Sequence, residues 1–221
     1  VQTCALPILG VVEPQSSGIG GGGFIVMGDA AGKVETIDGR EAAPAAATPT
    51  WFYAEGLPMP IREAIPGGRS VGVPGNLRLA ALAHTKHGKL AWRTLFEPAI
   101  RLARDGFAIT TRLNASLTMF KETAALDPAA RALFFDATGN ALPVGTVVKN
   151  PALAATLERI AGRGADAFYS GENAASIAAK VGTSPINPAP MTTGDIAAYR
   201  AIERPPDRKS TRLNSSHVSE S

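Results

Sequence analysis

A dense run of glycines near the start of the chain limits what can follow it. Residues 18–24 read "GIGGGGF", and Gly18, Gly20 and Gly23 match the dinucleotide-binding pattern G-x-G-x-x-G. That motif needs a strand before the glycines and a helix after them, because the N-terminus of the helix binds the pyrophosphate. Here "EPQSS" precedes the run, and the apolar stretch 24–27 follows it. The context therefore argues against a phosphate cradle.

The segment after the glycines has the pattern of a β-hairpin. The apolar stretch is followed by the turn-forming cluster "GDAAGK" and then by a shorter alternating run at 34–37. Two such runs joined by a glycine-containing loop predict paired antiparallel strands. Residues 42–73, rich in Ala, Pro and Gly, come next. We expect a long irregular connection there, of the kind that often carries function.

Most of the remaining chain has helical patterns. Asn150 followed by Pro151 is typical of a helix start, and Thr192 with Asp195 is typical of a capping box. Pro98 predicts a kink or break, because proline removes a hydrogen bond inside a helix. Gly88 and Gly106 are expected to follow helix ends. The predicted helices lie in the stretches "VPGNLRLAALAHTKHG", "AWRTLFEPAIRLARDGF", "NPALAATLERIAGRG", "GENAASIAAKVG" and "TTGDIAAYRAI".

Composition narrows the class of protein. The 221 residues are 45% hydrophobic and 19% charged, as in globular domains. The net charge of +3 is spread without a basic run, so we expect no nucleic-acid partner. No apolar run approaches the roughly 20 residues of a membrane span, and we expect none. The single cysteine excludes an intrachain disulfide. We expect neither a metal nor an organic cofactor.

The two ends differ in character from the rest. "VQTCALPI" at the start and "DRKSTRLNSSHVSES" at the end resemble translated adapter or vector sequence, although a natural disordered tail is the alternative for the latter. We therefore expect residues 1–8 and 207–221 to be non-native, with the interpretable domain over 9–206. Cys4 and His217 then carry no functional weight.

Arg40 is the main candidate binding residue. It stands in "IDGRE", at the end of a predicted strand and at the start of the irregular segment. An arginine there can present its planar guanidinium to a carboxylate through two hydrogen bonds. The alternative is a local ion pair with Asp38 or Glu41, without further function.

Other chemically competent residues are weaker candidates. His84 and His87 lie three residues apart on a predicted helix, but no third metal ligand accompanies them at a suitable spacing. Thr192 and Thr193 could be nucleophiles, yet hydroxyls at a helix start normally cap it. We interpret the threonines as a cap and assign no catalytic or metal-binding residue to the chain.

Six stretches resemble γ-glutamyltransferases, also called glutathione hydrolases. In order they are "VVEPQSSGIGGGGF", "TIDGREAAPAAAT", "SVGVPGN", "FEPAIRLARDGFAI", "DAFYSGENAASIA" and "GDIAAYRAIERPP". The resemblance covers nearly all of residues 11–206, in the N-terminal part of the family's large subunit. Cephalosporin and glutaryl acylases of the same superfamily are the alternative.

The resemblance implies a mixed α/β fold, part of the four-layer αββα sandwich of N-terminal-nucleophile hydrolases. Such a precursor cuts itself, and the new N-terminal threonine of the small subunit attacks the γ-glutamyl amide of glutathione, with its own α-amine as the base. The family's substrate-binding arginine falls on Arg40, which would hold the α-carboxylate. Glu41 would support it or the substrate amine. The glycine run would then be packing beside the pocket.

The resemblance also implies what this chain would not do alone. The small subunit would bring the nucleophile, so we expect these 221 residues by themselves to be inactive and incapable of self-processing. Unpaired strand edges would make the isolated chain poorly stable. Bacterial members of the family are commonly exported, so a periplasmic or secreted location is expected, with no signal peptide in this sequence.

Overall fold

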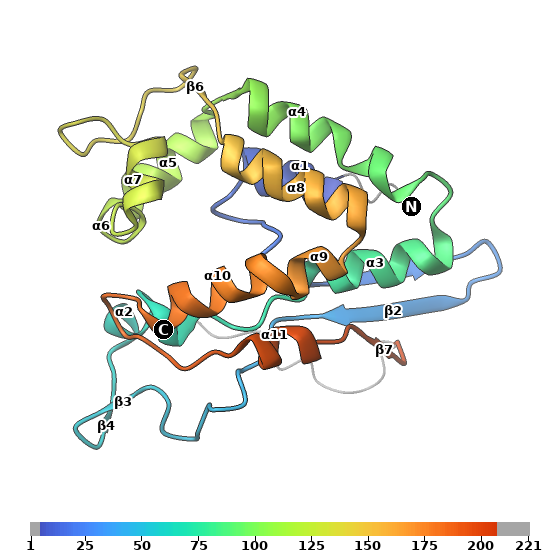
Figure 1. The fold of residues 1–221 in the computed structure, drawn as a ribbon, viewed down its shortest axis with the longest axis horizontal. Coiled ribbons are helices and arrows are strands. Elements are labelled where there is room, and N and C mark those ends of the chain that lie inside the picture. The colour runs from blue at the N-terminus through green and yellow to red at the C-terminus, as the bar shows by residue number, and fades with distance from the viewer. Residues whose placement is uncertain (1–4, 207–221) are drawn as a thin grey trace.

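The computed structural model describes residues 5–206, which form helical layers over a small antiparallel sheet (Figure 1). Cys4, His217 and the whole predicted tail at 207–221 lie outside the described residues. The strands are β1 (Gly23–Gly28), β2 (Val34–Gly39), β3 (Tyr53–Ala54), β4 (Leu57–Pro58), β5 (Phe107–Ala108), β6 (Val147–Val148) and β7 (Ile202–Arg204).

Helices make up most of the regular structure. They are α1 (Ala5–Val12), α2 (Ile61–Ala64), α3 (Asn76–His87), α4 (Glu97–Asp105), α5 (Thr111–Met119), α6 (Lys121–Ala124), α7 (Pro128–Phe134), α8 (Pro151–Arg163), α9 (Asp166–Tyr169), α10 (Gly171–Gly182) and α11 (Thr193–Ala198). Two 3-10 turns, η1 (Gly68–Ser70) and η2 (Trp92–Leu95), complete them. The mixed α/β class expected from the sequence is confirmed, with sheets that are small.

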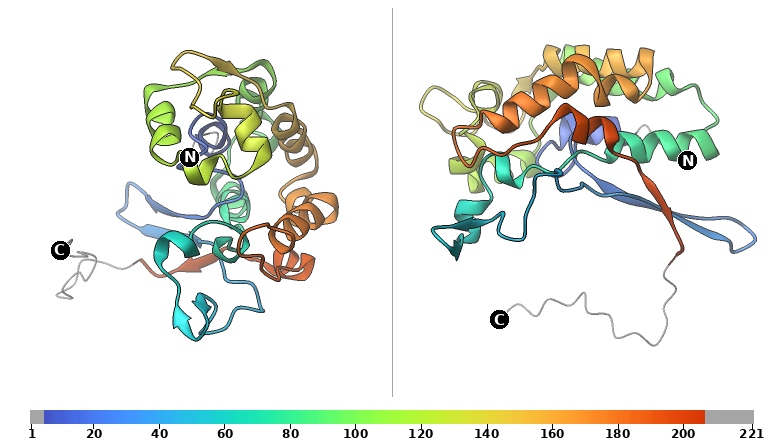
Figure 2. Two further views of the ribbon diagram at one scale, coloured as in Figure 1. Left: turned by 90° about the vertical axis from the view of Figure 1, so that its left-hand side faces the viewer. Right: turned by 60° about the horizontal axis from the view of Figure 1, so that its bottom comes forward.

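The predicted hairpin is present directly after the glycines. β1 pairs antiparallel with β2, with Ile25 opposite Ile37, and β7 adds to the far side of β2. The hairpin extends past the end of α3 (Figure 2). Gly32 in its turn has a φ of 78°, a conformation that glycine adopts without strain.

The sheet has one packed face. Ile37 is fully buried against Leu79 and Ala83 of α3. On the other face Phe24 and Val26 are 59% and 68% exposed, and no described element covers them. An alternating strand normally buries one face and solvates the other with polar residues. Large apolar residues on the second face are therefore unusual for a finished surface.

Most helix predictions are confirmed. Pro98 lies in the first turn of α4, directly after η2, so the sequence "AWRTLFEPAIRLARDGF" is broken in two as expected. Gly106 ends α4 with a φ of 110°. Gly88 follows α3 but has a φ of −67°, so it does not use the left-handed conformation that a glycine helix end would predict.

Some elements were not predicted. α5, α6 and α7 form an arm over residues 111–134 for which no helix was predicted. α1 begins at Ala5, inside the stretch 1–8 expected to be foreign, and it buries Pro7 and Val11. The boundary at residue 9 stays a prediction. The connection over 42–73 is largely irregular, as expected, and contains only β3, β4, α2 and η1.

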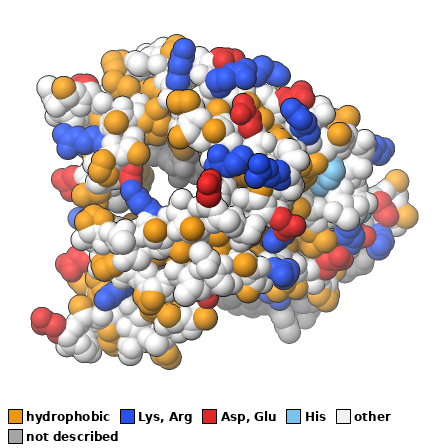
Figure 3. All heavy atoms as spheres, viewed as in Figure 1, with side chains coloured by type: hydrophobic (Ala, Val, Ile, Leu, Met, Phe, Trp, Pro, Cys, Tyr) orange, Lys and Arg blue, Asp and Glu red, His pale blue; other side chains and the backbone are white. Residues whose placement is uncertain are grey.

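Lysine and arginine side chains on the face drawn in Figure 3 lie among acidic ones over α4 and α8. There Arg101 and Arg104 share a shallow surface with Glu97 and Glu158. Within residues 5–206, no helix combines the length and apolar character that crossing a membrane requires.

The threonine pair at the start of α11 has a structural role. Thr192 Oγ1 accepts a hydrogen bond from Asp195 N, and Thr192 N donates to Asp195 Oδ2 at 2.8 Å. This is the predicted capping box. Thr192→Ala should lower the free energy of unfolding by about 0.5–2 kcal/mol. Thr193→Ala, one residue on and exposed, is the matched control and should cost less. Thermal melting of both variants in the full-length protein measures this, and equal shifts would contradict it.

Candidate functional site

Arg40 and Glu41 lie at the junction of two surface hollows. They follow the last residue of β2 and line both cavities. One cavity of about 640 Å³ is bounded by Asp38, Asp195, Tyr199, Arg200 and Arg204, among others. The other, of about 510 Å³, is bounded by the glycine run, Ser16, Ser17 and Asn76, among others. The irregular segment after Arg40 also lines the first cavity, through Ala42, Ala43, Ala45 and Val73.

The Arg40 side chain is accessible and only partly engaged. It is 60% exposed, and its Nη1 lies 3.1 Å from Glu41 Oε2. That contact is an ion pair without hydrogen-bond alignment, so the buried Oε2 atom of Glu41 has a charged neighbour but no hydrogen bond. A guanidinium carries five N–H donors. Arg40 can therefore keep its pair with Glu41 and still bind a second carboxylate.

Asp38 holds the backbone of Arg40 in place at the site. Its Oδ1 accepts a hydrogen bond from Arg40 N at 2.9 Å, and its Oδ2 accepts one from Arg204 Nε at 2.6 Å. The Arg40 N–H, followed by the Arg204 guanidinium, holds the pKa of Asp38 below its usual range. The sequence left Asp38 and Glu41 open as local partners of Arg40. The Arg40 side chain pairs with Glu41, and its backbone N–H donates to Asp38.

The glycine run packs against the next helix. Gly21 O accepts hydrogen bonds from Gly75 N and Asn76 N, both at 2.9 Å, at the start of α3. Asn76, 8% exposed, donates from Nδ2 to Gly18 O at 2.6 Å. These N–H groups are the ones that a helix N-terminus would offer to a phosphate. Because the loop's own carbonyl occupies them, the packing interpretation holds.

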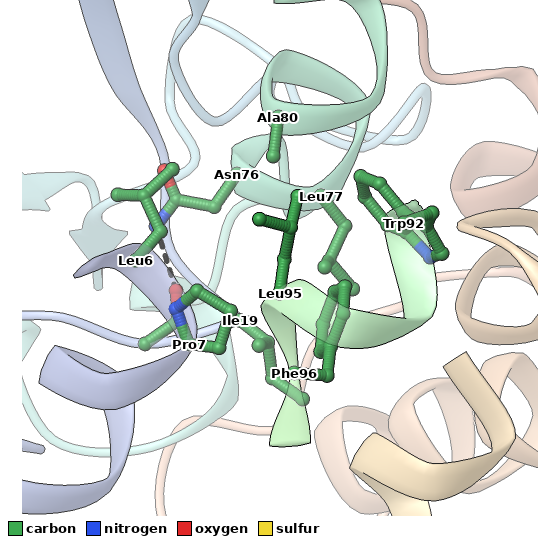
Figure 4. A pocket seen from close by; sticks show the side chains of 10 residues that line it. Leu6, Pro7, Ile19, Asn76, Leu77, Ala80, Trp92, Leu95 and Phe96 are labelled. Carbon is green, nitrogen blue, oxygen red and sulfur yellow. Dashed lines mark hydrogen bonds between the residues drawn. The ribbon is translucent and has the colours of Figure 1, made fainter. Parts of the chain in front are cut away.

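Behind the loop the interior is closed by apolar side chains. Figure 4 shows Asn76 bonded to the loop amid side chains from α1, α3 and η2. The space among them is about 10 Å³, roughly that of a single water molecule. The lining residues are Leu6, Pro7, Gly18, Ile19, Asn76, Leu77, Ala80, Trp92, Leu95 and Phe96. This pocket supports the loop and is too small for a substrate.

The histidines make separate contacts. His84 Nε2 lies 2.8 Å from Leu90 O, and its ring meets the edge of Trp92. His87 Nε2 lies 3.0 Å from Glu35 Oε2. Glu35 also pairs with Lys33 and Lys86, and these cations with His87 lower its pKa to about 2. Over residues 5–206, no three of His, Cys, Asp and Glu are grouped to hold a metal.

Two residues of the site were not found by sequence reasoning. Asn76 anchors the glycine run, and Tyr199 donates from its hydroxyl to Arg40 O at 2.5 Å. Both contacts join segments far apart in the chain. Both residues stand in stretches that resemble the family, Asn76 in "SVGVPGN" and Tyr199 in "GDIAAYRAIERPP", but nothing in those stretches indicates a role at this site.

The chain is similar to known enzymes. A glutathione hydrolase proenzyme from Arthroderma benhamiae is 39% identical over 86% of this chain and 31% of its own length. A Helicobacter pylori γ-glutamyltranspeptidase structure superposes with a TM-score of 0.87 at 30% identity, over 95% of this chain and 59% of that one. A cephalosporin acylase from Bacillus halodurans superposes with a TM-score of 0.78 at 27% identity, over 95% and 39%.

The family model identifies the family of this chain. The chain spans about a third or less of the length of the curated relatives it matches. The family model described as gamma-glutamyltranspeptidase covers residues 4–218, almost the whole sequence. The fold is therefore part of an N-terminal-nucleophile hydrolase, and the chain belongs to the γ-glutamyltranspeptidase (glutathione hydrolase) family.

Proposed function

We propose that the full-length protein cleaves the γ-glutamyl amide bond of glutathione and transfers the γ-glutamyl group to water or to an amino acid. The observation that carries this is the exposed Arg40 guanidinium beside Glu41, at the junction of two hollows, in a chain of this family. A planar fork of donors suits the α-carboxylate of a γ-glutamyl group.

Arg40 and Glu41 bind substrate and do not carry out the chemistry. Arg40 holds the α-carboxylate, which fixes the amide carbon relative to a nucleophile. Glu41 pairs with Arg40 and supports it or the substrate's α-ammonium group. Thr192 is engaged in its capping box, so it is not the nucleophile. The nucleophile, an N-terminal threonine exposed by self-cleavage, comes from the remaining polypeptide, the small subunit.

The remaining polypeptide has a surface on which to bind. On the uncovered face of the sheet, Phe24 and Val26 on β1 and Ile202 on β7 form an exposed patch in which Thr36 and Asp38 of β2 lie between the apolar residues. Packing a second sheet there would bury that patch and complete the sandwich. Export to the periplasm or the cell exterior is part of the same proposal and rests on the family alone.

The test is an activity assay of two forms of the protein. The full-length protein, incubated with glutathione, is expected to release free glutamate or to transfer the γ-glutamyl group to an added dipeptide. The 221-residue chain alone is expected to release none, because it lacks the nucleophile. Failure of the self-processed full-length protein to act on any γ-glutamyl amide would overturn the proposal.

A further inference from the structure

The backbone of Arg40 is held at both ends of its residue. Its N–H donates to Asp38 Oδ1 at 2.9 Å, and its carbonyl oxygen accepts the Tyr199 hydroxyl at 2.5 Å. The side chain of the same residue is 60% exposed. An accessible guanidinium therefore stands on a fixed peptide, which is how a binding residue is pre-organised.

Tyr199 can fix that peptide because its own ring is fixed. Tyr199 is 8% exposed and stacks on Tyr169, with ring centroids 6.2 Å apart and planes inclined by 14°. Tyr169 is 1% exposed, and its hydroxyl donates to Pro74 O at 3.0 Å. The Arg78 guanidinium lies 4.4 Å from the centroid of the Tyr169 ring. The Tyr199 hydroxyl thus projects from a buried stack of two rings.

The space around this hydrogen bond is filled. A Cβ at Gly75 would overlap both the Gly39 carbonyl oxygen and the Tyr199 hydroxyl. Immediately beyond Arg40 and Glu41, Ala42 and Val73 exchange two backbone hydrogen bonds, at 3.2 and 2.7 Å. No other polar group among the described residues donates to the Arg40 carbonyl. Loss of the hydroxyl would leave that carbonyl without its donor.

We infer that Tyr199 is a positioning residue for substrate binding: its hydroxyl sets the orientation of the Arg40 peptide and, through it, the direction of the guanidinium. This rests on the proposed role of Arg40 as the ligand of the substrate carboxylate. Tyr199 acts only through Arg40, because its hydroxyl bonds the backbone carbonyl of that residue. Binding of a substrate that lacks the carboxylate should therefore not depend on Tyr199.

The test is Tyr199→Phe in the full-length protein, assayed with two chromogenic anilide donors. A γ-glutamyl anilide carries the α-carboxylate, and a 4-aminobutyryl anilide keeps the amine but lacks the carboxylate. The variant should raise KM for the γ-glutamyl donor by about 2- to 10-fold, the effect of one neutral hydrogen bond, with kcat nearly unchanged. KM for the 4-aminobutyryl donor should not change. In an Arg40→Ala background, Tyr199→Phe should have no further effect.

Asn114→Ala is the matched control. It removes a part-buried side chain that donates to a backbone carbonyl, Leu142 O at 2.9 Å, on α5 and outside both hollows, so thermal melting should show a loss of stability without a change in the ratio of the two KM values. If Arg40→Ala abolishes the preference for the donor with the carboxylate but Tyr199→Phe leaves the ratio of KM values unchanged, the inference is overturned and the proposed function stands. If the wild-type protein itself shows no preference for the donor with the carboxylate, both are overturned.

Discussion

Arg40→Ala in the full-length protein should lower kcat/KM for γ-glutamyl donors by about 10²- to 10⁴-fold. A bidentate grip on a carboxylate contributes two charge-assisted hydrogen bonds of about 1.5–3 kcal/mol each, and tenfold corresponds to about 1.4 kcal/mol. The substitution also leaves the buried Glu41 Oε2 atom without its charged neighbour, which adds to the loss. Steady-state kinetics with a γ-glutamyl anilide measure the effect.

Two further variants test whether the loss is specific to the Arg40 guanidinium. Arg40→Lys keeps the charge but not the planar fork, so it should recover only part of the activity. Arg104→Ala removes an arginine of similar exposure, 54%, that pairs with its neighbour Asp105 on α4, and it should change nothing. An Arg40→Ala protein that retains kcat/KM within threefold of wild type would show that Arg40 forms only its local ion pair.

Gly22→Ala should disrupt the site through the glycine run, which packs against Glu41. A Cβ at this position would lie 2.5 Å from Glu41 N and 2.7 Å from both Gly39 O and Glu41 Oε2. Two of these are backbone atoms, which cannot move aside as a flexible side chain can. Overpacking of this kind costs about 1–3 kcal/mol. We expect a thermal midpoint lower by several degrees and a higher KM for the γ-glutamyl donor, because Glu41 and then Arg40 must shift.

Gly20→Ala is the internal control for this experiment. A Cβ at Gly20 meets nothing within 4 Å, so the variant should behave as wild type. In the dinucleotide pattern Gly20 is a position where the backbone approaches the pyrophosphate, and Gly22 is not one of the required glycines, so that pattern gives no reason for Gly22→Ala to be the more damaging change. Melting temperatures of the two variants therefore test the packing interpretation. Greater damage from Gly20→Ala would contradict the packing interpretation.

The local part of the fold could be predicted from the sequence. The hairpin after the glycines, the break at Pro98, the Asn150 cap and the Thr192 capping box all depend on residues close together in the chain. The arm α5–α7 was missed, although Asp127 caps α7 and Pro128 follows it, a signature of a helix start. That signal was present and could have been read.

The site depends on contacts that the sequence does not encode locally. Arg40 could be singled out because it ends a strand beside an irregular segment. The partner of its side chain could not be predicted, because Asp38 pairs with Arg204 of β7, at the other end of the chain. Tyr199 and Asn76 likewise reach the site only through tertiary packing. The role of Arg40 in binding a carboxylate came from the family resemblance and remains a proposal.

The most direct test of the whole account is the donor preference of the full-length protein. Three anilides suffice: γ-glutamyl, 4-aminobutyryl without the carboxylate, and glutaryl without the amine. The account predicts that the γ-glutamyl donor has the highest kcat/KM and that loss of either group lowers it, the carboxylate through Arg40. Turnover of the glutaryl donor as fast as, or faster than, the γ-glutamyl donor would contradict it and identify an acylase.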